Sequence, residues 1–263
     1  MSTETSHSGL VRSLGKRVRV KPSRVQISPS PLCTGESVRG ETHREFESFT
    51  HRRIFLYNLS MPNLYQRFIV PRLLNSAMGS AELEKIRRSV LADASGIVLE
   101  IGVGPGHNLP LYRHISKLYA LEPSKELIHI AQTRAGSLSF PIEFLNAGAE
   151  HIPLAEHSVD TVVSTWTLCS VSDPRKVLQE IVRVLRPEGR FIFVDHGASP
   201  VRSIRVVQKI LTRGTKYFTG NCHFDRDIKE LIADAGLHIK KLEHPHERFK
   251  PLIYNYGGIA VRS

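Results

Sequence analysis

The chain has 263 residues, which is enough for one α/β domain with a well-buried core and some extension. Its 41% hydrophobic content is typical of a soluble globular protein, and no apolar run approaches the roughly 20 residues that a membrane span needs. The formal net charge of +11 would attract nucleic acid, anionic lipid or acidic substrates, although a basic tail with solvated helix faces accounts for it more simply. The three cysteines, Cys33, Cys169 and Cys222, show neither zinc-site spacing nor a disulfide framework, so we expect no metal site and a reducing compartment.

Residues 1–41 are rich in Ser, Arg, Lys and Pro and have little apolar periodicity. This composition predicts a disordered basic arm rather than part of a core. A Ser- and Arg-rich segment with few acids is also typical of an organellar transit peptide, but the arm shows no clear amphipathic helix or cleavage site. We therefore expect a cytoplasmic protein, with organellar import as the alternative.

Residues 42–95 have a helical pattern that Pro62 and Pro71 divide into pieces, and we expect a helical cap here. The last helix of this segment carries an apolar stripe, made of Leu83, Ile86, Val90 and Leu91. Such a cap either packs on a sheet or covers a substrate pocket. Aromatic residues beside Arg67 and Arg72 could also place this segment in peripheral contact with an anionic membrane.

Strands and helices alternate from residue 96 onwards, which predicts parallel βαβ units in a domain of residues 96–263. Apolar runs predict five strands, at residues 97–101, 117–121, 142–145, 159–165 and 191–194. Two further strands, at about residues 237–242 and 253–261, are close enough in the chain for an antiparallel hairpin. The predicted fold is therefore α/β: a doubly wound sheet of seven strands, mostly parallel with an antiparallel C-terminal hairpin, and with helices on both faces.

Residues that cap helices mark the expected helix boundaries. Ser124 is placed to cap a helix through residues 127–131, and Asp173 followed by Pro174 is placed to open another. Gly189 is placed to end that second helix, and Gly236 to end a third helix over residues 225–235.

A glycine-rich segment follows the first of these strands. Its sequence, Ile-Val-Leu-Glu-Ile-Gly-Val-Gly-Pro-Gly-His-Asn over residues 97–108, predicts a buried strand, a tight turn and a helix start. Glycines let the backbone pass close beneath a ligand, and the N–H groups of a helix start favour a polar or anionic ligand group. A dinucleotide-binding G-x-G-x-x-G motif would need a third glycine at position 107, which is His107, and no Walker A lysine is present. Glu100, just before the loop, is unfavourable beside a pyrophosphate but suits a ligand that carries an ammonium group.

This acid and its G-x-G-x-G loop resemble the first motif of the class I S-adenosylmethionine-dependent methyltransferases, E/D-x-G-x-G-x-G. The resemblance implies a Rossmann-like fold and S-adenosyl-L-methionine as the cofactor. It also implies which residues of this segment bind the cofactor: Glu100, Gly102, Val103, Gly104, Gly106 and Asn108.

Three further features follow the next strands, at the carboxyl ends where open α/β sheets bind ligands. Glu122 lies 22 positions after Glu100, where a carboxylate can accept both ribose hydroxyls, and an adenine could lie against Pro123 and Ser124. The resemblance implies that Ala149 and Glu150 border the adenine. It implies that the segment beginning at Thr165 holds the methionine end of the cofactor and admits the substrate.

Other motifs narrow the resemblance. Residues 158–163 and 184–190 follow the pattern of the group that includes ubiquinone and menaquinone methyltransferases. Residues 167–171, residues 195–197 and the pair Cys222 and Arg226 are more similar to the methyltransferase-like proteins that act as alkyl thiol S-methyltransferases, and to their bacterial relatives. The resemblance covers about residues 65–261. The sequence departs from the usual pattern of the group at three positions, Glu188, Asp195 and Asn221.

The resemblance implies methyl transfer to a small-molecule acceptor, such as a thiol, by in-line displacement at the sulfonium methyl. A thiol must ionise before it attacks well. His196, just after the fifth predicted strand, is the best-placed candidate for a catalytic base, although a histidine that only positions the strand end explains its place equally well. His223 is a second candidate.

Two alternative functions stay open from the sequence. One is methylation of a quinone or phospholipid head group. The other is a basic nucleic-acid- or membrane-binding protein that retains only the cofactor fold. Glu100, the three glycines and Glu122 are all present, which favours a working cofactor site. Because no Asn/Asp-Pro-Pro-Tyr/Phe motif follows the fourth strand, no specific nucleic-acid partner is predicted.

Overall fold

The computed structural model describes residues 75–262, apart from residues 77, 137, 216–220 and 246–251. The predicted basic arm and most of the predicted helical cap lie outside the described residues. Within the described part of the chain, no helix is long and apolar enough to cross a membrane.

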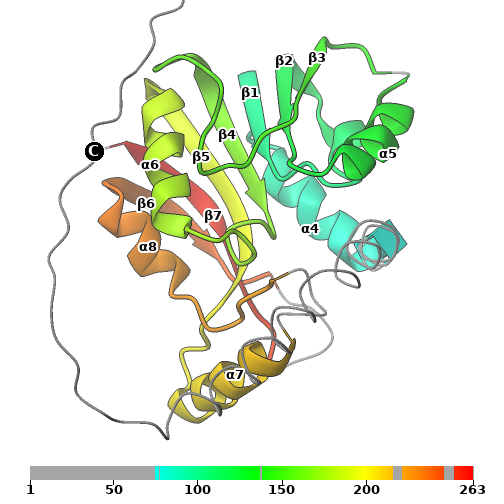
Figure 1. Ribbon diagram of the computed structural model, residues 1–263. Coiled ribbons are helices and arrows are strands. Elements are labelled where there is room, and N and C mark those ends of the chain that lie inside the picture. The colour runs from blue at the N-terminus through cyan, green and yellow to red at the C-terminus, as the bar shows by residue number, and fades with distance from the viewer. Residues whose placement is uncertain (1–74, 77, 137, 216–220, 246–251, 263) are drawn as a thin grey trace, which may run out of the picture. The chain divides into compact units, whose positions relative to one another are not determined.

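The sheet has seven strands in the spatial order β3-β2-β1-β4-β5-β7-β6 (Figure 1). Strands β1 to β5 run parallel, and β7 pairs antiparallel with both β5 and β6. The predicted fold is confirmed. The strand bounds are Ser95–Ile101 (β1), His114–Leu121 (β2), Ile142–Leu145 (β3), Val159–Thr165 (β4), Leu185–Gly197 (β5), Leu237–Glu243 (β6) and Tyr254–Arg262 (β7).

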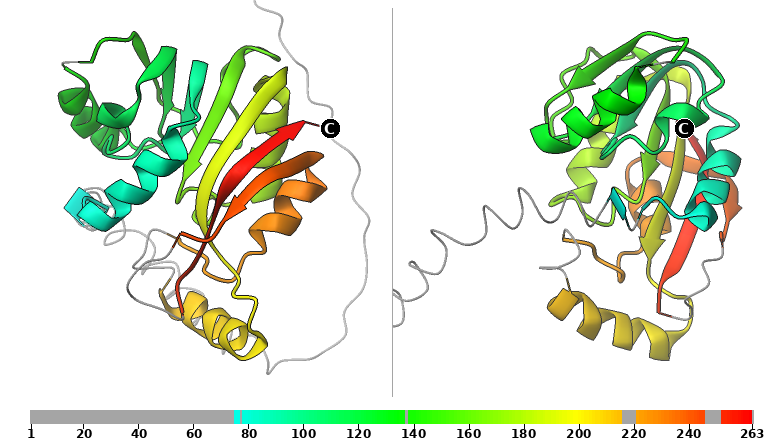
Figure 2. Two further views of the ribbon diagram at one scale, coloured as in Figure 1. Left: turned by 180° about the vertical axis from the view of Figure 1, so that it is seen from behind. Right: turned by 90° about the vertical axis from the view of Figure 1, so that its right-hand side faces the viewer.

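Helices cover both faces of this sheet. The described helices are α4 (Ala81–Leu91), α5 (Lys125–Ala135), α6 (Pro174–Val184), α7 (Arg202–Thr215) and α8 (Ile228–Asp234), with a single 3₁₀ turn, η2 (Leu109–Leu111). Buried side chains of α6 and α8 belong to one apolar cluster with the sheet, and those of α4, together with Ala131 of α5, belong to a second cluster. The two views agree with this division: α6 and α8 lie in front of the sheet in Figure 1, and α4 lies in front of it when seen from behind in Figure 2.

Two predicted helix caps form as expected. The Ser124 hydroxyl accepts the backbone N–H of Leu127 at 3.3 Å at the start of α5. The Asp173 carboxylate accepts the N–H of Lys176 at 3.1 Å at the start of α6, with Pro174 in the first turn. Gly236 follows α8 with a φ of 79°, which an L side chain rarely adopts.

Two local expectations about helices are wrong, and the fifth strand is longer than predicted. No α-helix follows the glycine loop: only the η2 turn forms, because the chain becomes extended again at Tyr112. The helix predicted to end at Gly189 ends at Val184, because the chain turns extended at Leu185 and enters β5, where Leu185 pairs with Val159 of β4. Strand β5 is therefore 13 residues long and contains Gly189.

The segment after β5 also differs from expectation. Helix α7 was not predicted, and it lies beyond the carboxyl end of β5 (Figure 1). Its apolar residues include Val206, Val207 and Ile210, which are exposed to solvent rather than packed in the core. Helix α8 begins at Ile228 rather than near residue 225, because Asp227 acts as its N-cap and accepts the N–H of Glu230 at 3.3 Å.

Candidate active site

The carboxyl ends of β1, β2, β4 and β5 open onto one cavity of about 760 Å³. Most residues that the sequence assigned to the cofactor line it: Glu100, Gly102, Val103, Gly104, Asn108, Glu122, Pro123, Ala149, Glu150 and Thr165. His196 lines the same cavity. Gly106 and Ser124 are not among its lining residues. The cavity lies at the edge where strand order reverses between β1 and β4, which is where ligands bind in open α/β sheets.

The glycines of the loop after β1 serve different purposes. A Cβ on Gly104 would meet nothing nearer than the Gly102 carbonyl oxygen at 3.9 Å, so the space beside this residue is open to a ligand. A Cβ on Gly106 would come within 2.8 Å of Leu109 and 3.0 Å of Ala131 in α5. Gly106 therefore allows the loop to pack closely on α5, which explains why it does not line the cavity.

Glu100 is buried beneath this loop and is held by two donors. The Asn108 amide donates to Oε1 at 2.8 Å, and the Tyr112 hydroxyl donates to Oε2 at 2.8 Å. Burial raises the pKa of Glu100 to about 7, despite these hydrogen bonds. The side-chain oxygen of Asn108 is buried and has no hydrogen-bond partner in the described part of the chain. A ligand with an ammonium group would supply a donor to that oxygen and a positive charge beside Glu100.

Glu122, at the end of β2, is bound to the glycine loop. Its Oε2 accepts the N–H of Gly104 at 3.0 Å, and its Oε1 accepts the N–H of Ser124 at 3.0 Å. Burial raises the pKa of Glu122. A carboxylate oxygen can accept two hydrogen bonds, so both oxygens keep the capacity to accept a hydroxyl of a ligand. Ser124 takes part through its backbone while its hydroxyl caps α5.

Glu150 connects two parts of the cavity wall. Its Oε1 accepts the N–H groups of Ser172 and Asp173 at 3.1 and 3.4 Å, so it holds the segment that leads into α6. The preceding Ala149 is buried, with 6% of its surface exposed, and packs in the cluster of α6.

The sequence predicted no site role for Arg87, which lines the cavity. The guanidinium of Arg87 in α4 lies 4.9 Å from the centre of the Trp166 ring and donates to the Met78 carbonyl oxygen at 2.9 Å. Burial lowers the pKa of Arg87 to about 10, which still leaves it charged at neutral pH. The Trp166 indole N–H in turn donates to the Asn255 side chain at 3.1 Å. Arg87 lies between apolar residues of an amphipathic helix, so nothing in the local pattern marked it as a site residue.

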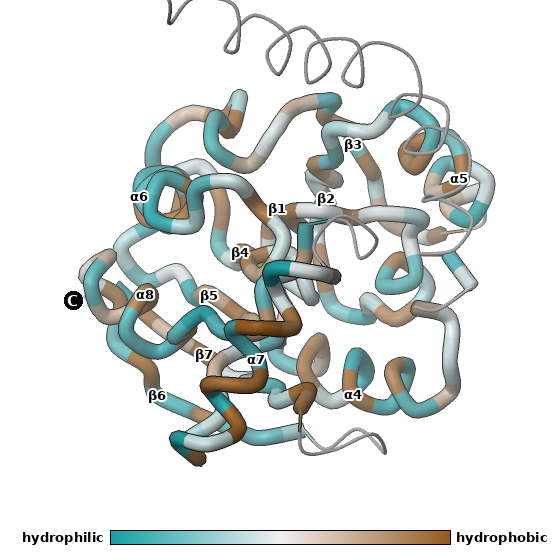
Figure 3. The backbone as a smooth tube through the Cα atoms, turned by 60° about the horizontal axis from the view of Figure 1, so that its bottom comes forward, coloured by the Kyte–Doolittle hydropathy of each residue, from teal (hydrophilic) through white to brown (hydrophobic). Residues whose placement is uncertain are grey.

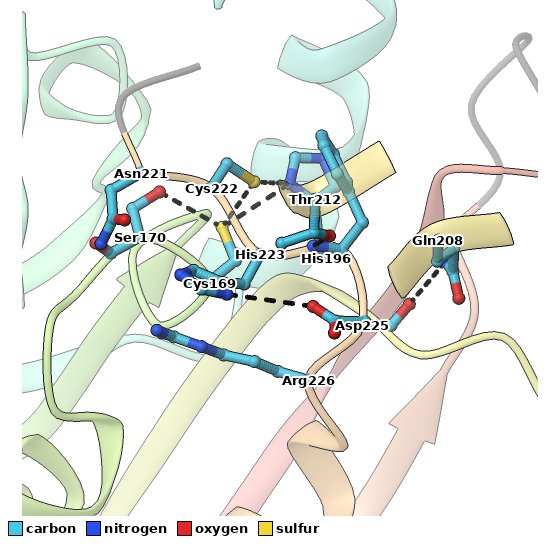
Figure 4. Close-up of polar contacts among 12 residues, drawn as sticks. Cys169, Ser170, His196, Gln208, Thr212, Asn221, Cys222, His223, Asp225 and Arg226 are labelled. Carbon is cyan, nitrogen blue, oxygen red and sulfur yellow. Dashed lines mark hydrogen bonds and ion pairs between the residues drawn. The ribbon is translucent and has the colours of Figure 1, made fainter. Parts of the chain in front are cut away.

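A cluster of two thiols and one imidazole, drawn in Figure 4, lines another part of the cavity. The His196 Nδ1 atom lies 3.3 Å from the Cys222 Sγ and 3.6 Å from the Cys169 Sγ, and the two sulfurs are 3.4 Å apart. The Phe224 ring centre is 5.2 Å from that of His196. His223, the second candidate base, does not line the cavity, and its ring pairs with Asp225 at 3.9 Å.

Asp195 holds the loop that carries Cys169. It is fully buried, and its carboxylate accepts the backbone N–H groups of Thr167, Leu168 and Cys169 at 3.3, 3.0 and 2.9 Å. Burial raises the pKa of Asp195. The hydrogen bond with Cys222, burial and the carboxylate of Asp195 raise the pKa of the Cys169 thiol well above its usual value. The sequence predicted no role for Asp195, which departs there from the usual pattern.

The chain matches known methyltransferases in sequence and in fold. Residues 99–193 match the family model described as a methyltransferase domain. The chain is 34% identical over 171 residues to thiol S-methyltransferase TMT1B of Rattus norvegicus. This alignment covers 63% of this chain and 70% of that protein. It is 31% identical over 146 residues to the phosphatidylethanolamine N-methyltransferase of Cereibacter sphaeroides, in an alignment that covers 55% of this chain and 71% of that protein.

A similar fold occurs in a solved structure of the methyltransferase bound to the Trm112 activator of Haloferax volcanii. The TM-score is 0.59 at 16% identity, over 76% of this chain and 96% of that one. The open space beside Gly104 and the unpaired oxygen of Asn108 fit a ligand with the shape and charge of S-adenosylmethionine. This chain belongs to the S-adenosylmethionine-dependent methyltransferases.

Proposed function

We propose that this enzyme methylates the sulfur of a small thiol. The observation that carries the proposal is that a single cavity joins the residues suited to the cofactor with the cluster of Cys169, His196 and Cys222. A soft, polarisable cluster next to an aromatic ring suits a small thiol better than a strongly solvated polar group. The similarity to a protein named a thiol S-methyltransferase supports the same acceptor.

The residues around the glycine loop would hold the cofactor. We assign the ribose hydroxyls to Glu122, the ammonium group to Asn108 and Glu100, and the methionine carboxylate to the buried cation of Arg87. When bound, S-adenosylmethionine supplies an electrophilic methyl group on a sulfonium. The protein's own contribution is to align the acceptor with that methyl and to exclude water.

His196 is the proposed catalytic residue. A thiol attacks well only after it loses its proton, and we place that loss beside His196, at the end of the cavity that Phe224 borders. The fixed positions of Cys169 and Asp195 hold this end of the cavity in one arrangement.

The test is methyl transfer from labelled S-adenosylmethionine by the purified full chain. An alkyl thiol, the alcohol of the same chain length and vesicles of phosphatidylethanolamine are compared as acceptors. We expect the labelled product with the thiol and none with the alcohol. Product on the phospholipid and none on the thiol would replace this proposal with head-group methylation.

We further propose that α7 brings the enzyme to an anionic membrane surface. Five of its residues or immediate neighbours are exposed apolar side chains: Val201, Val206, Val207, Ile210 and Leu211. The same helix carries Arg202, Arg205, Lys209 and Arg213 and no acidic residue, and Figure 3 shows its hydrophobic and hydrophilic stretches in alternation. An amphipathic basic helix of this kind binds at the interface of anionic lipids.

Sedimentation with vesicles tests this contact. We expect binding to vesicles that contain phosphatidylglycerol, weaker binding to pure phosphatidylcholine, and loss of binding in Ile210→Asp. Leu242→Asp, which replaces an exposed apolar residue on β6, outside α7, is the control. Equal binding by both variants would contradict a role for α7.

A further inference from the structure

The three potential ligand atoms of Cys169, His196 and Cys222 are arranged like one face of a tetrahedron. They lie within 4.8 Å of one another, and the three separations are 3.3, 3.4 and 3.6 Å. Around a tetrahedral zinc ion with bonds of about 2.3 Å to sulfur and about 2.0 Å to nitrogen, the ligand atoms are about 3.5 to 3.8 Å apart. Shifts of a few tenths of an ångström would therefore turn this hydrogen-bonded cluster into a coordination site.

From this geometry we infer that Cys169, His196 and Cys222 bind a zinc-class divalent cation, with its fourth coordination position open to the methyl-acceptor end of the cavity. The donor set favours such an ion, because thiolates and an imidazole select zinc over magnesium or calcium. Two thiolates and a neutral imidazole also cancel the charge of a divalent cation. Three protein ligands with one open position are typical of catalytic rather than structural zinc.

The ligands are held in place by the rest of the fold. Asp195 binds the amides of the Cys169 loop from one side, and Arg226 binds the carbonyl oxygens of Leu168 and Val171 from the other, the latter at 2.8 Å. Asp195 and Arg226 carry charges of opposite sign. Such outer contacts orient metal ligands and strengthen metal binding.

A second set of hydrogen bonds ties Cys222 to Cys169, although 53 positions separate them in the chain. The backbone N–H of His223 donates to the Cys169 carbonyl oxygen at 2.8 Å. The Asn221 amide donates to the Ser170 carbonyl oxygen at 3.0 Å, from a residue with a φ of 66°. The chain thus adopts an uncommon backbone conformation just before Cys222, in the arrangement that places both sulfurs beside the imidazole.

The role of the ion rests on the proposed function, whereas the binding of the ion does not. A thiol that enters the open position would replace a metal-bound water, form a metal–sulfur bond and release its proton to that water. The coordinated thiolate would then use a sulfur lone pair to form the new bond to the methyl carbon, while the carbon–sulfonium bond breaks and its electron pair stays on the cofactor's sulfur. With the ion bound, His196 is a ligand, and the ion takes over the task of generating the thiolate.

Metal binding is tested directly on the full chain. The protein is purified without chelators from zinc-supplemented cells and its metal content is measured, after which the metal-free protein is titrated with Co²⁺. We expect about one zinc per chain and a sulfur-to-cobalt charge-transfer absorption with tetrahedral d–d bands. Cys169→Ser, Cys222→Ser and His196→Asn should each weaken Co²⁺ binding by more than the tenfold to hundredfold that is typical of second-shell changes.

Cys33→Ser and His223→Asn are the matched controls, and both should keep the cobalt spectrum of the wild type. Circular dichroism confirms that each variant is folded. Absence of stoichiometric metal together with absence of the cobalt spectrum would overturn the inference, and a disulfide between Cys169 and Cys222 found by mass spectrometry in freshly purified protein would do the same.

The acceptor role has a separate readout. Addition of an alkyl thiol to the cobalt-loaded protein should change the d–d bands, and removal of the metal should lower methyl transfer to that thiol at least tenfold. A metal that binds without either response would overturn the acceptor role. Methyl transfer to thiols by a protein that binds no metal would leave the proposed function standing and reject the metal site alone.

Discussion

The backbone N–H of Gly104 donates to the carboxylate of Glu122 at 3.0 Å. The acid assigned to the ribose therefore also fixes the loop that passes beneath the cofactor. These two tasks are coupled, since the shape of the loop and the position of the carboxylate depend on the same hydrogen bond.

We predict that Glu122→Ala weakens binding of S-adenosylhomocysteine by at least tenfold, and that Glu122→Gln weakens it less. Alanine removes both the ribose acceptors and the anchor of the loop, and each hydrogen bond to a charged group contributes about 1.5 to 3 kcal/mol. Glutamine keeps one oxygen acceptor. Calorimetric titration measures both affinities, and Glu143→Gln, a change in a half-exposed acid on β3, is the control. Equal affinities for Glu122→Ala and wild type would remove Glu122 from the cofactor site.

We predict that Gly104→Ala and Gly106→Ala fail in different ways. The methyl group on Gly104 enters open space beside the ligand, so cofactor binding should be lost while the fold pays only about 1 kcal/mol for a side chain at a φ of 54°. The methyl group on Gly106 meets Leu109 and Ala131, so the melting temperature should fall markedly more. Thermal melting and ligand titration of both variants check this. A larger loss of stability in Gly104→Ala than in Gly106→Ala would contradict the division of roles.

Local patterns predicted the sheet and the first half of the site. Alternating strands and helices, with caps at Ser124 and Asp173, fix a βαβ topology, and this topology brings Glu100 and Glu122 to neighbouring strand ends. The position of the loop after β1 was predicted correctly, but the helix expected after it is a single 3₁₀ turn, because a proline in the first turn fits either structure.

The second half of the site depends on contacts distant in sequence. His196 is 27 positions from Cys169 and 26 from Cys222, and their meeting depends on how the chain returns after α7, a helix that the sequence did not reveal. Spacing rules for zinc sites address cysteines close in the chain, so they could not find this cluster. Arg87 was missed for a similar reason, since its partner Trp166 lies on a loop after β4.

We predict that cofactor affinity falls at acid pH because of Glu100. Burial raises its pKa to about 7, so below that pH the carboxyl is protonated and must lose a proton to receive the ammonium group. Affinity should drop by up to about tenfold per pH unit below about 7, and fall again above about 8, where an α-amino group loses its charge. Titrations from pH 5 to 9 measure the profile.

Glu100→Gln should bind more weakly at pH 7.5 and should lose the acidic limb of that profile. The same shift affects the stability of the ligand-free protein. A carboxyl whose folded pKa lies above its unfolded value is destabilising once it ionises, so wild type should lose stability between about pH 4.5 and 7 relative to Glu100→Gln. An unchanged difference in melting temperature between the two proteins across this range would show that Glu100 is ionised throughout.

The last prediction concerns His196→Asn and the acidity of the acceptor. Alkyl thiols have a pKa above the cysteine value of about 8.5 and need help to ionise near neutral pH, whereas acidic aromatic thiols ionise unaided. If His196 promotes ionisation, as a base or as a ligand of an ion, the variant should lose on the order of a hundredfold in kcat/KM with alkyl thiols and far less with acidic ones. Rates for a thiol series in wild type, His196→Asn and the control His223→Asn give the dependence on acceptor pKa. A steeper dependence in His196→Asn than in both other proteins is the expected result. An equal loss of kcat/KM across the whole series would mean that His196 only positions the end of β5. The thiolate would then be generated by another group, and the methyltransferase assignment would stand.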